Sequence, residues 1–567
     1  MAIRIVRVEP FDLVVFGGTG DLAYRKLYPA LFNRERSNQF SEPTRIVGAS
    51  RRHLERDEFR ALVKDALAKF AGAKDETDAD AGDKANDTVR VDGRDVRARC
   101  VAEGGNLGFT QRGRVEYALT GGRINTDAID NSAGVDTSDH EVNIKILLDG
   151  AVRTAEMSEI DRNALLVGMT DEVAALVLRD NYRQNRALDS ARAQAVEMEE
   201  VHSRYIRALE SAHDLDREVE GLPSDEQLAE RADEGAGLTA PELAVLLAYA
   251  KITLEEDLLA GPLPDDPDFL SELLRTFPTG IQTRFLDRIR VHPLRREITA
   301  TSLANGVVNR SGVTFVFRLG EETGAAPAEI VRAHEAARAI FDQEQLWRAI
   351  EALDARIEVD TQTDMYLAAR RLVERATRWL LRNRRRPLPV AATVAEFAPA
   401  VAPLREMAAL APEIEPATAA YAAQGVPTTL ARQIASLDRL PRALDVAELA
   451  RAHDTGVEEV ATAYNETGAK LRLDWLADRI SELPHTGRWD SLARNALRED
   501  LAAEQRSIID AVMTAGGYDV WASEHATDVA RLLRVLDELR AHGVVDVTTL
   551  AVALREVRAL SPTDQPG

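Results

Sequence analysis

The sequence predicts a Rossmann-like, doubly wound α/β region followed by a large all-α region. Up to about residue 150, short apolar runs alternate with helical patterns. Several of these runs end in glycine, asparagine or serine, as they do where a doubly wound sheet builds a ligand crevice. From residue 151 the strand signal almost disappears, and amphipathic helical patterns continue to residue 567.

The first elements predict a βαβα unit over residues 1–70. We expect strands at 11–16 and 44–49, and helices at 22–33 and 56–70. Residues 71–88 carry six acidic side chains and few apolar ones, so they predict an acidic linker.

A second α/β stretch follows at residues 89–150. We expect strands at 96–102 and 124–129 and helices at 110–119 and 139–148, with all four strands of the chain in one composite sheet. Cys100 falls inside the first of these strands, which predicts a buried thiol.

Helices are expected throughout residues 151–567. Thr239-Ala-Pro-Glu242 has the spacing of a capping box and begins a helical pattern that continues over 243–259. Residues 388–426 are rich in alanine and proline, and we expect short helices broken by Pro399, Pro403, Pro412 and Pro416.

Composition excludes several classes of protein. The formal charge of −23 repels phosphate backbones and anionic lipid, which argues against nucleic-acid and membrane partners. With Cys100 as the single cysteine and no signal-peptide or membrane-span pattern, we expect a cytoplasmic protein. The ten histidines are scattered without ligand spacing, so no metal site is predicted.

The first candidate site is a glycine-rich turn that follows the strand at 11–16. Glycines let the backbone approach a pyrophosphate, which the free N–H groups of a helix N-terminus stabilise. The alternative is a tight strand-to-helix turn without a ligand. Arg51 and Arg52 follow the second strand, where arginine suits the 2′-phosphate of NADP. The turn consists of Gly17, Gly18, Thr19, Gly20, Asp21 and Leu22.

Residues 11–31 and 45–51 resemble the amino-terminal coenzyme-binding unit of glucose-6-phosphate dehydrogenase. The resemblance covers residues 1–70 and implies NADP binding by the turn and Arg51. That family's His-Tyr-Leu-Gly-Lys segment has no counterpart, since His140 is followed by Glu-Val-Asn. We therefore expect no oxidation of glucose 6-phosphate.

The second candidate site lies in two loops of the next α/β stretch. Glu103-Gly104-Gly105-Asn106 follows one expected strand, and Asn131-Ser-Ala-Gly-Val-Asp-Thr-Ser138 follows the other. The glycines let the main chain approach a ligand, and asparagine offers a donor and an acceptor. Ser138 also has capping-box spacing to Glu141, so helix capping is its alternative role.

These loops, with residues 121–127, 243–251, 291–296 and 302–310, resemble the large bacterial NAD-specific glutamate dehydrogenases. The resemblance covers about residues 72–567. It implies that residues 89–150 are the distal half of a nucleotide-binding domain. It also implies that Gly104, Gly105, Asn106 and Asn131 bind NAD, that Ser138 contacts the substrate, and that the chain forms a homo-oligomer.

The reaction implied is the oxidative deamination of L-glutamate to 2-oxoglutarate and ammonium. No residue in 1–97 resembles that family's glycine-rich segment with the catalytic lysine, so the catalytic residue stays unassigned and we expect no turnover above background. Two alternatives remain open: a glucose-6-phosphate dehydrogenase fragment, and an inactive helical assembly module with a vestigial nucleotide site. The two resemblances join near residues 70–74.

Overall fold

The computed structural model describes residues 12–16, 28, 45–49, 56–70, 91–104, 108–483, 488–543 and 545–561. The chain divides into two compact units, residues 1–97 and 98–567. The glycine-rich turn at 17–22, Arg51, the acidic linker at 71–88, Gly105 and Asn106 lie outside the described residues, as does the expected helix at 22–33 apart from Tyr28.

The first unit contains a short parallel sheet. Strand β1 (Asp12–Phe16) pairs with β2 (Arg45–Ala49) in a register that sets Val14 opposite Val47. Helix α2 (Arg56–Phe70) places Phe59 against the buried ring of Tyr28, with ring centroids 5.9 Å apart. These two strands and the helix agree with the elements expected from the sequence.

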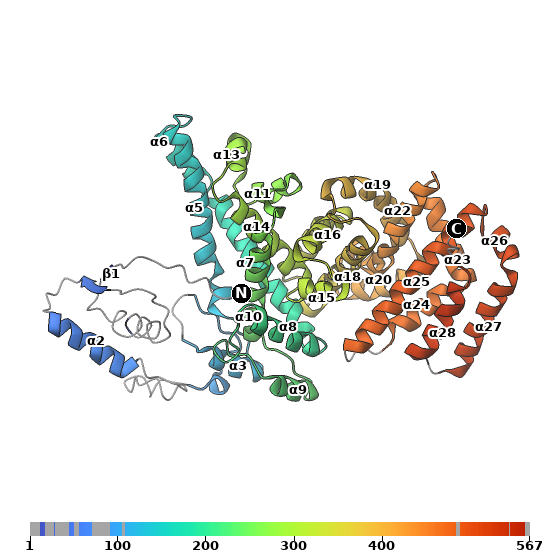
Figure 1. The fold of residues 1–567 in the computed structure, drawn as a ribbon, viewed down its shortest axis with the longest axis horizontal. Coiled ribbons are helices and arrows are strands. Elements are labelled where there is room, and N and C mark those ends of the chain that lie inside the picture. Colours follow the sequence, from blue (N-terminus) through green and yellow to red (C-terminus); the bar gives the residue numbers. More distant parts are fainter. Residues whose placement is uncertain are drawn as a thin grey trace. The chain divides into compact units, whose positions relative to one another are not determined.

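The second unit is built of helices (Figure 1). Those that carry the two sites discussed below are α3 (Gln111–Leu119), α4 (Asp127–Asp130), α5 (Ser132–Arg153), α7 (Thr170–Ala193), α8 (Glu199–Ala212), α10 (Ala240–Ala260), α15 (Phe315–Thr323), α18 (Val359–Asn383) and α25 (Arg488–Thr514). The others are α6 (Glu159–Gly168), α9 (Asp225–Asp233), α11 (Leu270–Leu274), α12 (Thr279–Arg284), α13 (Leu286–Arg290), α14 (Arg295–Ser311), α16 (Pro327–Ile340), α17 (Gln343–Glu351), α19 (Val390–Ala409), α20 (Glu415–Ala423), α21 (Thr428–Ser436), α22 (Ala443–Ala452), α23 (Val457–Lys470), α24 (Leu473–Ser481), α26 (Tyr518–Glu524), α27 (Ala526–His542) and α28 (Val547–Arg558).

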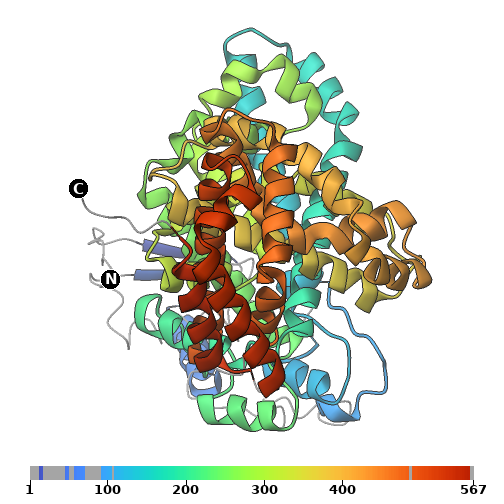
Figure 2. The ribbon, with the colours of Figure 1, turned by 90° about the vertical axis from the view of Figure 1, so that its right-hand side faces the viewer.

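The largest hydrophobic core of this unit joins α7, α10, α14, α16 and α18, and includes the fully buried Leu243, Leu303 and Ala369. A second core lies among the C-terminal helices, drawn in red in Figure 2, where α25, α27 and α28 lie side by side. The capping box predicted at the start of α10 is confirmed: Thr239 is the N-cap, and the buried carboxylate of Glu242 accepts from its backbone N–H and its hydroxyl, both at 2.7 Å.

The predicted Rossmann-like doubly wound region is wrong for the part of the chain that the structure describes. There β1 pairs with β2 alone, so the composite sheet is wrong too. Among the described residues, 96–102 contribute a single isolated bridge, between Cys100 and Arg123, and 124–129 contribute none. Other backbone groups of these segments bond elsewhere: the Tyr117 hydroxyl donates to the Ala98 carbonyl at 2.5 Å, and the Thr126 carbonyl accepts from the Ile129 and Asp130 N–H groups at the start of α4, both at 3.0 Å.

Two further expectations need correction. Cys100 is exposed, because no sheet covers the segment that carries it. Pro399 and Pro403 lie inside one continuous helix, α19, whereas Pro416 is in the first turn of α20, where its missing N–H is not needed.

Among the described residues, no helix is both long and apolar enough to cross a lipid bilayer.

Candidate functional site

The two loops singled out in the sequence meet in the structure. Around the Cys100–Arg123 bridge, the Val101 N–H donates to the Arg123 carbonyl at 2.9 Å, and the Arg123 N–H donates to the Arg99 carbonyl at 3.1 Å. The segment before α3 is therefore held against the segment before α4, although these described residues form no sheet.

A buried ion pair shapes the first loop. The Glu103 carboxylate accepts from the Gly108 and Phe109 N–H groups at 2.5 and 3.0 Å, and from the Arg114 guanidinium at 3.0 and 2.7 Å. Both side chains of the pair are more than nine-tenths buried. Burial opposes ionisation of Glu103, but these hydrogen bonds and the charge of Arg114 outweigh it and lower the pKa of the carboxyl. Glu103 thus holds the backbone at Gly108 and Phe109 and the guanidinium of Arg114 in one place.

The second loop is fastened to the first by two further contacts. Asp130 accepts from the Glu103 N–H at 2.9 Å and from the Asn125 amide at 3.2 Å. Asn131, between α4 and α5, donates its amide to the Gly104 carbonyl at 3.1 Å. The structure thereby brings together Gly104 and Asn131, two of the expected cofactor residues.

Two glycines leave space around this contact. Among the described residues, a Cβ atom at Gly104 would meet nothing within 4 Å, so these residues leave the backbone there open to a ligand. A Cβ atom at Gly134 would lie 3.2 Å from the Asn131 amide, so glycine at 134 gives that amide its room.

Ser138 lies inside α5, not at its N-terminus, so the alternative of helix capping is wrong. Its hydroxyl is exposed and donates to the Gly134 carbonyl at 3.3 Å. Seven residues make about two helical turns, so Asn131 and Ser138 share one side of α5. The same side carries two exposed apolar side chains, Val135 and Val142.

The opposite side of α5 carries a charged cluster. Asp136, His140 and, from α7, Asp180 hold ligand-type atoms within 4.8 Å of one another. Lys251 of α10 donates to the Gln184 amide oxygen at 2.9 Å. Burial lowers the pKa of Lys251 to about 8, because it outweighs the charges of Asp180 and Asp136, which raise this pKa. Because an ammonium group already faces both carboxylates, we assign no metal to this cluster.

Three residues of this region have structural roles that the sequence did not predict. Glu103 and Arg114 position the first loop, and a buried ion pair of this kind leaves only a weak signal, an acidic residue before the glycines and an arginine eleven residues later. Lys251 ends the apolar run 243–251, which predicts only core helix.

The arrangement suits binding of an elongated ligand along the exposed side of α5. The Asn131 donor is engaged by Gly104, which leaves its amide oxygen as an acceptor. The Ser138 hydroxyl can turn from the Gly134 carbonyl and donate to an anion.

Comparisons with known proteins cover both parts of the chain. A family model described as "Bacterial NAD-glutamate dehydrogenase, catalytic domain" matches residues 52–191, which include Glu103, Asn131 and Ser138. A second, "Glutamate dehydrogenase, C-terminal", matches residues 235–559. Over 526 residues, 89% of this chain, the sequence is 42% identical to the NAD-specific glutamate dehydrogenase of Mycobacterium tuberculosis and 43% identical to that of Pseudomonas aeruginosa.

The chain spans about a third of these relatives, 32% of the length of each. Another similarity is confined to 67 residues, 12% of the chain, which are 63% identical to part of the glucose-6-phosphate 1-dehydrogenase of Rhizobium meliloti and cover 14% of it. The C-terminal family model, in contrast, matches more than half of the 567 residues. The chain therefore belongs to the NAD-specific glutamate dehydrogenase family.

Proposed function

We propose that this chain acts in the NAD-dependent oxidative deamination of L-glutamate, in which glutamate, NAD⁺ and water give 2-oxoglutarate, ammonium and NADH. The observation that carries the proposal is the 42% identity over 526 residues to a protein named for this activity. The contact between Asn131 and Gly104 supports it, because the family resemblance assigns both residues to the cofactor.

The dinucleotide would lie beside the contact between Gly104 and Asn131, with Gly104 and Gly105 as the residues that allow close approach and with Asn106 and Asn131 as hydrogen-bonding groups. The substrate carboxylate would lie at Ser138, two turns along the same side of α5. An exposed hydroxyl that donates to a carboxylate makes a charge-assisted hydrogen bond, which is stronger than its present bond to a carbonyl.

Binding is the direct readout, since no catalytic base is assigned. We expect NADH fluorescence titrations to give saturable binding that Asn131→Ala weakens. Ser138→Ala should weaken 2-oxoglutarate binding to the NADH complex about tenfold and leave NADH affinity unchanged. If NADH does not bind, or if Ser138→Ala weakens both ligands equally, the assignment of these two residues is wrong.

A second candidate function rests on the short similarity to glucose-6-phosphate 1-dehydrogenase. We propose that residues 1–70 bind NADP through the turn Gly17, Gly18, Thr19, Gly20, Asp21 and Leu22, with Arg51 at the 2′-phosphate. A charge-assisted bond of this kind contributes about 1.5–3 kcal/mol, or roughly ten- to a hundredfold in affinity. Calorimetric titration of NADP on the chain and on Arg51→Ala tests it, because tighter NAD binding or an unaffected variant contradicts NADP recognition.

The remaining alternative is an inactive helical assembly module. It predicts that neither NADH nor NADP binds, and that the chain still forms its homo-oligomer. The same titrations, combined with light scattering, separate it from the two dehydrogenase proposals.

A further inference from the structure

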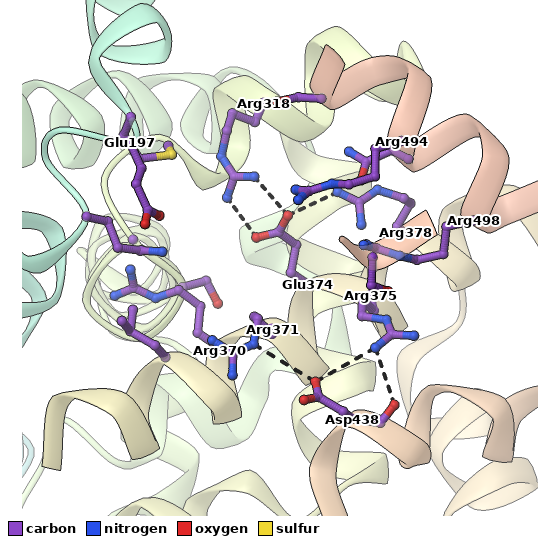
Figure 3. Close-up of a pocket in the computed structure, with 18 of the residues that line it drawn as sticks. Glu197, Arg318, Arg370, Arg371, Glu374, Arg375, Arg378, Asp438, Arg494 and Arg498 are labelled. Carbon is purple, nitrogen blue, oxygen red and sulfur yellow. Dashed lines mark hydrogen bonds and ion pairs between the residues drawn. The ribbon is translucent and has the colours of Figure 1, made fainter. Parts of the chain in front are cut away.

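A large cavity in the helical unit is lined by arginines and belongs to neither site above. Its volume is about 1040 Å³, and its walls come from α8, α15, α18, α25 and the short helical turn at 437–442. Figure 3 shows the guanidinium groups of Arg318, Arg378, Arg494 and Arg498 gathered around Glu374.

Two of the arginines are paired with carboxylates of the cavity lining. Arg318 forms a bidentate pair with Glu374 at 2.8 and 2.7 Å. Arg378 bonds to Glu322 at 2.8 Å and to Glu374 at 3.0 Å. Glu374 and Glu322 are therefore already engaged, and they offer little to the other cations of the cavity.

Other arginines of the lining are left without such partners. Among the described residues, Arg370, Arg494 and Arg498 make no hydrogen bond or ion pair, and the Nε atom of Arg494 is buried and unpartnered. Burial lowers the pKa of Arg494, and the charge of Glu197 opposes this only in part. Among the described residues, the one hydrogen-bond and ion-pair partner of Arg375 is Asp438, whose carbonyl lies 3.3 Å away and whose carboxylate lies 3.9 Å away.

The lining holds ten arginines and nine carboxylates, and the positive charge is concentrated on α18 and α25, where the arginines are incompletely neutralised. Burial, reinforced by the neighbouring Arg318, lowers the pKa of Arg370 to about 10. Burial and the neighbouring Arg498 lower the pKa of Arg375 to about 10 as well. The pKa of Arg498 is lowered by burial, Arg494 and Arg378. Each of these cations has lost hydration without gaining a full counter-charge.

Two other features indicate that this cavity is a ligand site. His202, only 3% exposed, lines the cavity, and its Nδ1 atom is buried without a hydrogen-bond partner. Gly312 adopts φ +104°, and a Cβ atom there would lie 2.9 Å from Nη1 of Arg370. The backbone at 312 therefore makes room for the guanidinium.

We propose that this cavity binds a small polyanion that carries two or more phosphate groups. Its volume lies at the upper end of the range for small-molecule pockets, about 300–1,000 Å³, and exceeds the need of one phosphate ion. The arginines belong to three helices, and a tetrahedral phosphate accepts from several directions, whereas a carboxylate accepts in one plane. This site goes beyond the proposed dehydrogenase function and does not depend on it.

Calorimetric titration of the full chain with sodium tripolyphosphate tests the proposal. We expect saturable binding, weakened about tenfold or more by Arg498→Gln and by Arg370→Gln. The matched control is Arg385→Gln, which removes the same charge from an exposed position outside the cavity and should change the affinity less than twofold. A parallel titration with citrate, a tricarboxylate of similar charge, should give weaker binding.

The stability of the unliganded variants separates a binding role from a structural one. Since Arg498 has no partner among the described residues, Arg498→Gln should unfold at the same temperature as the parent or higher. If that variant fails to fold, or unfolds at a lower temperature, Arg498 is structural and the proposal is wrong. The proposal is also wrong if tripolyphosphate does not bind, if Arg385→Gln weakens binding equally, or if citrate binds as tightly.

Discussion

Removing the Glu103 carboxylate should release the backbone N–H groups of Gly108 and Phe109. In Glu103→Ala, the buried Arg114 guanidinium keeps only Asp127, at 3.4 Å, and the Gly108 and Phe109 N–H groups lose their acceptor. Breaking a buried ion pair by removing one partner costs about 3–5 kcal/mol. Each 1.4 kcal/mol is about a factor of ten in an opening equilibrium, so the amides of Gly108 and Phe109 should exchange with solvent about a hundred- to several-thousandfold faster.

Hydrogen exchange followed by mass spectrometry on a peptide that spans residues 103–117 measures this change. Glu103→Gln retains an acceptor for the two N–H groups and should show a smaller acceleration. The matched control is Glu141→Ala, which removes an exposed partner of Lys145 on α5, a pair of the kind that contributes about 0.3–0.5 kcal/mol. If Glu103→Ala accelerates exchange no more than Glu141→Ala does in its own peptide, the Glu103 carboxylate does not hold these amides.

Three further predictions follow from the same unit. Glu242→Ala removes the fully buried carboxylate that caps α10 and accepts from the Arg231 guanidinium at 2.8 Å. It should lower the free energy of unfolding by about 3–5 kcal/mol in urea titrations, and a loss below 1 kcal/mol would contradict a buried ion pair between Glu242 and Arg231. Because the pKa of Lys251 falls from 10.5 in the unfolded chain to about 8 in the native one, the unfolded state binds more protons between these values. The parent should then gain up to about 3 kcal/mol relative to Lys251→Met as the pH rises from 8 to 10.5, and pH-independent differences would refute the desolvated ammonium. Gly134→Ala should displace the Asn131 amide and weaken NADH binding several-fold while helix stability stays within about 1 kcal/mol, and unchanged NADH affinity would show that this amide does not serve the cofactor.

Local signals in the sequence identify several elements of the fold. The capping box at Thr239 and Glu242 is encoded within four residues, and the structure contains it as predicted. Strands β1 and β2 pair with each other through short apolar runs that are also recognisable locally.

The doubly wound sheet could not be decided in this way, because a strand needs a partner that local sequence does not supply. The apolar and polar residues of Val96–Ala102 alternate as in a strand, yet among the described residues its single β-bridge is to Arg123. The side chains of Tyr117 and Asp130 bond to the backbone of Ala98 and Glu103 instead. Alternation alone does not distinguish an edge-paired segment from a sheet strand.

In the candidate site, too, some residues could be predicted from local sequence and others could not. Asn131 and Gly104 were predicted from short motifs, and the structure places them in contact. Glu103, Arg114 and Lys251 depend on burial and on partners distant in sequence, which only the packed helices reveal. The arginine cavity draws on residues from 191 to 498, so no local pattern could have indicated it.

The most direct test of the proposed dehydrogenase site is hydrogen exchange of the whole chain with NADH and 2-oxoglutarate, alone and together. We predict that NADH protects peptides covering 98–109 and 123–134, and that 2-oxoglutarate adds protection around residue 138 that Ser138→Ala abolishes. Protection confined to residues 1–70 would instead place the dinucleotide in the N-terminal unit. No protection in either region at saturating NADH would contradict dinucleotide binding by this chain.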